Sequence, residues 1–104
     1  MKKFKEILKT LDDISHLKGF NLFDESNNPI GSVLNKSGTQ GSLRVYNSLW
    51  VNFNKINIEA AKKGIELFAE HAIDAKNNPG KHPNIDRLFQ IIEYESVIQM
   101  KVIK

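Results

Sequence analysis

The run over residues 59–77 constrains the fold of this chain more than any other stretch. It reads EAAKKGIELFAEHAIDAKN and is rich in residues that favour helices. Its apolar side chains recur along one face at helical spacing, at Ala61, Ile65, Phe68, Ala72 and Ala75. Asn57 can cap the start of the run, and the following NNPG ends it. The sequence therefore predicts a long amphipathic helix that buries its apolar face against a core.

Three further segments have helical periodicity. In residues 1–11, four apolar side chains fall at i, i+3, i+4 and i+7. A second helix is predicted over residues 43–53, capped by Ser42 or Thr39. A third begins near Asn84, which can cap it.

Other segments predict strands. Residues 19–23 and 30–34 flank the turn-forming run DESNNP, which is typical of a β-hairpin. The C-terminal run SVIQMKVIK alternates apolar and polar side chains, so it predicts a half-buried strand at a sheet edge. We expect a single domain over residues 1–104 with an α+β fold. Its small antiparallel sheet, the hairpin plus the C-terminal strand, is covered on one face by three to four helices.

The chain has no cysteine, which excludes disulfides, thiolate metal sites and a cysteine nucleophile. No apolar run is long enough for a secretory signal or a membrane span, so we expect a cytoplasmic protein without membrane contact.

The net charge of +3 originates in residues 26–58, which contain three basic residues and no acidic one. Such an excess can attract an anionic ligand. It falls short of the dense lysine and arginine surface of a dedicated nucleic-acid-binding protein.

Residues 71–86, HAIDAKNNPGKHPNID, place two histidines and two aspartates around a Pro-Gly turn. His71 and Asp74 would share one helical face, and the turn would return His82 and Asp86 toward them. Imidazole and carboxylate groups suit Zn, Mn or Fe, so a metal or acid/base site is one interpretation. The spacing matches no established metal signature, and a structural junction between two helices is the alternative.

The same side chains have structural explanations. Asp74 lies near a helix C-terminus, where its charge is unfavourable unless Lys81 or Arg87 pairs with it. His82 precedes a proline, which favours extended backbone, and its ring can hydrogen-bond a carbonyl that fixes the turn. The sequence leaves both interpretations open.

The run NKSGTQGSLR at residues 35–44 is a second candidate site. Glycines, hydroxyl groups and a helix start can form a cradle for phosphate or carboxylate. The predicted anion-binding residues are Lys36, Ser37, Gly38, Thr39, Gly41, Ser42 and Arg44. This is not a P-loop, because serine rather than lysine follows the second glycine. A flexible connection from strand to helix is the alternative.

Tyr46, Trp50 and Phe53 lie beside Arg44, an arrangement that could stack single-stranded bases. Their spacing places all three on one helical stripe, which favours a core role instead. No serine has the frame of a hydrolase nucleophile such as G-x-S-x-G, so we assign no catalytic residue and no cofactor.

The runs GSLRVYNSLW (residues 41–50) and EAAKKGIELFAEHAIDAKNNPGKHPNIDRL (residues 59–88) resemble a family of small bacterial proteins, domain of unknown function 2322. The resemblance implies a short bacterial protein and transfers no activity. We expect a binding protein rather than an enzyme, whose partner is another protein or a second copy that pairs along the C-terminal strand. Binding of a small anion at residues 36–44 is the alternative. A metal-dependent enzyme centred on His71 and His82 is the third.

Overall fold

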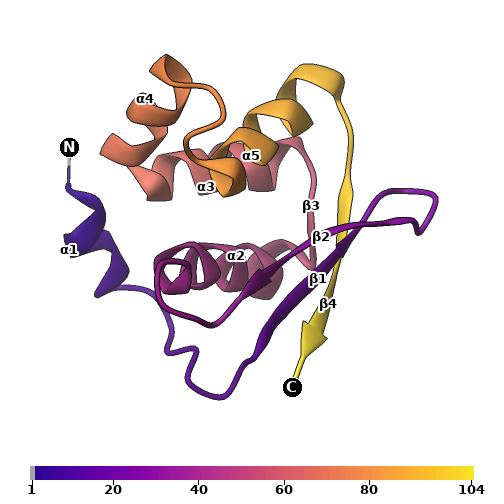
Figure 1. Cartoon of the computed structure of the whole chain (residues 1–104), viewed down its shortest axis with the longest axis horizontal. Helices are drawn as coiled ribbons and strands as arrows, with labels where there is room; N and C mark the ends of the chain where they lie inside the picture. The colour runs from indigo at the N-terminus through magenta and orange to yellow at the C-terminus, as the bar shows by residue number, and fades with distance from the viewer. Residues whose placement is uncertain (1) are drawn as a thin grey trace.

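The computed structural model describes residues 2–104. The elements in chain order are α1 (Phe4–Leu8), β1 (Gly19–Phe23), β2 (Pro29–Leu34), α2 (Gln40–Phe53), β3 (Lys55–Ile56), α3 (Ile58–Phe68), α4 (Glu70–Asn77), α5 (Pro83–Tyr94) and β4 (Ile98–Ile103). The strands form one antiparallel sheet in the order β2-β1-β4-β3 (Figure 1). The predicted α+β fold is confirmed, with β3 and a fifth helix added.

The sheet has one buried face and one face toward solvent. Along β1, Phe20 and Leu22 are fully buried, whereas Asn21 between them is exposed. Phe20 lies opposite Val33 of β2, and Leu22 lies opposite Met100 of β4. Because side chains alternate along a strand, this register gathers the apolar residues of all three strands beneath the helices.

The C-terminal strand is only in part the sheet edge that we expected. β1 pairs along one side of β4, and β3 pairs with Ile98 and Gln99 on the other. β3 exists because Asn54 adopts left-handed backbone (φ 63°), which ends α2 and turns the chain back to the sheet. Among the described residues, the edge strands are β2 and the two-residue β3, which leaves residues 100–103 of β4 without a strand on that side.

The helix predicted over residues 59–77 is divided at Ala69, where φ is 53° and ψ is −122°. Its start is as predicted, since Asn57 Oδ1 accepts a hydrogen bond from the Ala60 N–H at 2.9 Å. The break redirects α4 toward α5 while Ala72 and Ala75 stay buried. Alanine strongly favours helices, so the sequence carries no local signal for this break.

The limits of three other helices also differ from the predictions. α1 spans five residues, fewer than the helix predicted over residues 1–11, of which residue 1 lies outside the described part. α2 begins earlier, at Gln40. The N-cap position of α5 is His82 and its first residue is Pro83, so Asn84 lies in the first turn and does not cap it.

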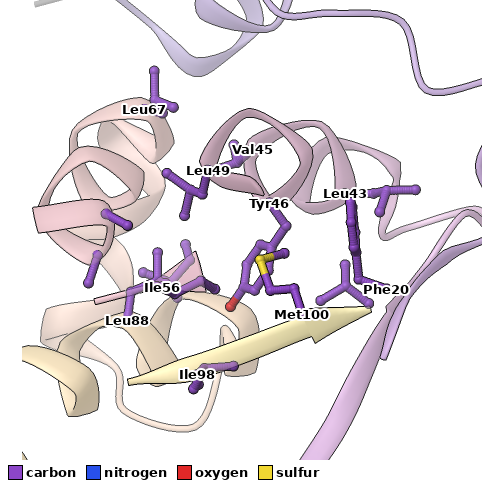
Figure 2. Close-up of a cluster of buried hydrophobic side chains, with 14 of the residues drawn as sticks. Phe20, Leu43, Val45, Tyr46, Leu49, Ile56, Leu67, Leu88, Ile98 and Met100 are labelled. Atoms are coloured by element: carbon purple, nitrogen blue, oxygen red, sulfur yellow. The ribbon is translucent and has the colours of Figure 1, made fainter. Parts of the chain in front are cut away.

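The core lies between the helices and the sheet, where side chains from both layers meet (Figure 2). Tyr46 is fully buried in it, and Trp50 packs against Phe20 with ring centroids 5.7 Å apart. Phe53 packs against the same cluster. The aromatic stripe therefore belongs to the core. Within residues 2–104, every helix is too short or too polar to cross a membrane.

Candidate functional site

A cleft of about 590 Å³ opens between α1, the first turn of α2 and the turn that joins α4 to α5. Small-molecule sites in proteins commonly measure about 300–1,000 Å³. Residues 38–42 and residues 81–85 both line the cleft. The fold thus joins two stretches that the sequence presented as separate candidate sites.

The first turn of α2 forms one wall. The leading N–H groups of any helix have no partner inside it. Thr39 occupies the N-cap position of α2 but its side chain makes no capping bond. Its hydroxyl donates instead to the carbonyl of Leu34, at 2.5 Å, and also approaches that of Lys36. Among the described residues, no side-chain cap is therefore made to the first N–H groups of α2, at residues 40–42.

The turn between α4 and α5 forms the opposite rim. Asp74 Oδ2 accepts from Lys81 Nζ at 2.9 Å and lies 2.6 Å from His82 Nε2. The hydrogen bond from His82, followed by that from Lys81, lowers the pKa of Asp74 to about 2. The basic partner that Asp74 needs is therefore Lys81, and His82 holds this carboxylate rather than a carbonyl.

The four residues predicted as one polar cluster are divided among different contacts. His71 packs edge-on against Phe4, with ring centroids 5.0 Å apart. Asp86 Oδ2 accepts from the Gly80 N–H at 2.9 Å and closes the Pro-Gly turn. Across the described residues, no three His, Cys, Asp or Glu side chains are arranged to hold a metal ion. Only Asp74 and His82 form a direct pair.

The residues predicted for anion binding are also divided. Those that line the cleft are Gly38, Thr39, Gly41 and Ser42. Those that do not line it are Lys36, Ser37 and Arg44. The guanidinium of Arg44 donates to the carbonyl of Leu8 at 3.2 Å, which ties α1 to α2. The positive side chain at the cleft is instead Lys81, from the other stretch.

The cleft also has an apolar side, which the sequence did not assign to any site. It is formed by Phe4 and Leu8 of α1 together with Phe68 at the end of α3. Phe4 stacks on Phe68 at 5.5 Å, and its N–H donates to Glu70 Oε1 at 2.7 Å. This bond lowers the pKa of Glu70. The apolar stripe of residues 1–11 predicted that α1 would pack on the domain but could not indicate where.

Among the described residues, basic rather than acidic side chains line the cleft. Lys81 and two histidines line it, and none of the described residues that line it is acidic. Asp74 offsets part of this charge from behind the rim. The combination of backbone N–H groups and basic side chains suits a carboxylate or phosphate.

A family described as uncharacterized protein conserved in bacteria, domain of unknown function 2322, matches residues 4–102. The chain belongs to this family, which confirms the resemblance. Searches of curated proteins and of solved structures find no match. Arguments about function therefore start from the geometry of the cleft.

Proposed function

We propose that this member of an uncharacterized bacterial family binds a small ligand through an anionic group, phosphate or carboxylate, in the cleft. One observation supports the proposal above all. The uncapped first turn of α2 and the basic rim at Lys81 and His82 line the same cleft, and none of the lining side chains within residues 2–104 is acidic.

The donors on the two sides differ in kind and complement each other. The N–H groups at residues 40–42 lie at the positive end of the α2 dipole. At the rim, Asp74 engages one donor of Lys81 and one ring nitrogen of His82. An ammonium group has three donors, so Lys81 retains donors for a ligand, whereas His82 has a second donor only in the form with both ring nitrogens protonated. Asp74 thereby positions both side chains without saturating Lys81.

Titration of ¹⁵N-labelled protein with inorganic phosphate tests this proposal. We expect saturable shifts of the amide resonances of residues 40–42 and of Lys81 and His82. The dissociation constant should lie near the millimolar range, which corresponds to about −4 kcal/mol. Absence of saturable shifts at these amides would overturn the proposal.

A pair of lysine substitutions adds a matched control. Lys81→Ala should weaken phosphate binding about tenfold, or 1.4 kcal/mol, because it removes a charge-assisted hydrogen bond at a partly exposed site. Lys76→Ala changes the net charge equally, but Lys76 lies in α4 outside the cleft. Equal losses in the two variants would show that phosphate responds only to overall charge.

Self-association is a second candidate function, favoured by the edge strand β2. Its outer side lacks a strand partner, and Pro29–Leu34 contains no charged side chain. Ile30 and Leu34 are 45% and 37% exposed. Edge strands without charges readily pair with a second copy, in a dimer around a twofold axis.

A cytoplasmic location remains a prediction from the sequence.

Light scattering at high protein concentration tests this second candidate. A dimer should be observed, and Ile30→Lys should convert it to monomer, since a charge on the edge opposes strand pairing. A mass of 11.9 kDa for the unmodified chain would refute self-association.

A further inference from the structure

We propose that the anionic ligand of the cleft carries an aromatic ring, which lies against α1 and the end of α3. This inference rests on the anion binding proposed above and narrows the ligand to aromatic phosphates or carboxylates. It follows from the size of the cleft, the rings along its wall and the exposure of α1.

The cleft is too large for an anion alone. Its volume of about 590 Å³ equals that of roughly twenty water molecules at about 30 Å³ each. A phosphate or carboxylate group at the first turn of α2 fills only a small part of this space. The cleft therefore has room for a second, larger part of the ligand.

The wall of the cleft is a row of four rings. Phe68 stacks on Phe4 at 5.5 Å, Phe4 contacts His71 edge-on at 5.0 Å, and His71 lies 5.9 Å from His82. Aromatic rings associate at centroid distances of about 4.5–7 Å, stacked or edge-on. The row runs from the apolar side of the cleft to His82, beside Lys81. A ring attached to an anion can therefore contact the row while the anion reaches the basic rim.

The apolar side of the cleft is incompletely buried at α1, whereas Phe68 beneath it is only 2% exposed. α1 has no fully buried residue, and Phe4 and Leu8 remain half-buried. Figure 1 shows α1 at the end of the molecule away from β4, where it packs against α2, α3 and the start of α4. Two hydrogen bonds hold it there, from the Phe4 N–H to Glu70 and from Arg44 to the Leu8 carbonyl. A ligand ring in the cleft would cover apolar surface that the chain itself leaves open.

The affinities for phenyl phosphate, methyl phosphate and phenol measure the contributions of the aromatic ring and of the anionic group separately. We expect phenyl phosphate to bind at least about tenfold more tightly than methyl phosphate, because burial of much of the ring adds hydrophobic free energy. Phenol should bind far more weakly than phenyl phosphate. In the unmodified protein, ring protons of phenyl phosphate should show nuclear Overhauser effects to the rings of Phe4 and Phe68.

A substitution in α1 adds an independent check. Phe4→Leu keeps an apolar side chain but removes the ring, so it should reduce the preference for phenyl phosphate over methyl phosphate. Phe23→Leu is the matched control, because Phe23 lies under Lys101 and outside the cleft.

The possible outcomes distinguish failure of the aromatic ligand from failure of anion binding. Equal affinity for phenyl and methyl phosphate would overturn the aromatic ligand and leave anion binding intact. No binding of either phosphate would overturn both. Phenol bound as tightly as phenyl phosphate would refute the anionic group while supporting the aromatic wall. Overhauser effects to other parts of the protein would place the ring elsewhere and refute the inference.

Discussion

Replacement of Tyr46 by phenylalanine tests how α2 and α5 are joined beside the cleft. The Tyr46 hydroxyl donates to the carbonyl of Asn84 at 2.7 Å and accepts from Arg87 Nη1 at 3.0 Å. Burial raises the pKa of this hydroxyl, so it stays protonated and can donate at neutral pH. Phenylalanine preserves the buried ring and removes only the two hydrogen bonds.

The expected cost follows from what the two partners retain. Arg87 is half-buried and keeps its hydrogen bond to Asn84 Oδ1 at 2.9 Å. The Asn84 carbonyl also accepts the regular backbone hydrogen bond of α5. Neither partner is fully orphaned, so the free energy of unfolding should fall by about 2 kcal/mol, within the range for a lost buried hydrogen bond. With a urea slope of about 1.5 kcal/mol per molar, the unfolding midpoint should fall by roughly 1.3 M.

Urea unfolding followed by Trp50 fluorescence and by circular dichroism measures this change. Tyr94→Phe is the matched control, since Tyr94 is 71% exposed and its substitution should alter stability by less than about 0.5 kcal/mol. If Tyr46→Phe remains within that margin of the unmodified protein, with an unchanged slope, the hydrogen bonds between α2 and α5 do not stabilise the fold as argued.

Three further predictions concern the cleft rim and the helices. The pKa of Asp74 is depressed from its usual 3.8 to about 2, so its contribution to stability should be complete above about pH 5 and be lost as the pH falls through 2. Carboxyl NMR titration should give this midpoint, and Asp74→Asn should remove this part of the pH dependence. Asn57→Ala should lower the free energy of unfolding by about 1 kcal/mol through loss of the α3 cap, whereas Asn57→Asp should be nearly neutral in urea unfolding. Gly64→Ala would place a methyl carbon 2.7 Å from Leu88 Cδ1 and 3.0 Å from Leu49 Cδ1. The cost of this overpacking, about 1–3 kcal/mol, should exceed the gain in helix propensity of about 1 kcal/mol, so the variant should be less stable. A raised urea midpoint would contradict the packing argument.

The candidate site could be predicted only in part. Residues 35–44 and residues 71–86 drew attention because glycine, hydroxyl, histidine and carboxylate groups are chemically conspicuous. Their shared cleft could not be predicted, because nearly thirty residues of helix and strand separate them. Phe68 is buried as its apolar stripe predicted, but the place of Phe4 in the cleft wall was missed for a different reason. An apolar side chain in a half-exposed cleft has the same helical spacing as one in the core.

The sequence by itself determined the local elements of this protein. Alternation and helical spacing predicted the hairpin, the C-terminal strand and the amphipathic helices, because those periods reflect backbone geometry that any burial must follow. The Asn57 cap was equally local, since an N-cap needs only its own helix. The absence of acidic residues over residues 26–58 predicted an anion site there, but Lys36 and Arg44 do not line the cleft.

The tertiary structure alone decided the helix break, the strand order and the partners of Asp74, which the periodic patterns of the sequence leave undetermined. The break at Ala69 follows from packing of α4 toward α5, which overrides the helix preference of alanine. The insertion of β4 between β1 and β3 depends on strand pairings distant in sequence. Asp74 finds Lys81 and His82 because the turn between α4 and α5 returns the chain. These contacts depend on how whole helices and strands pack together, and that packing determines which residues line the cleft.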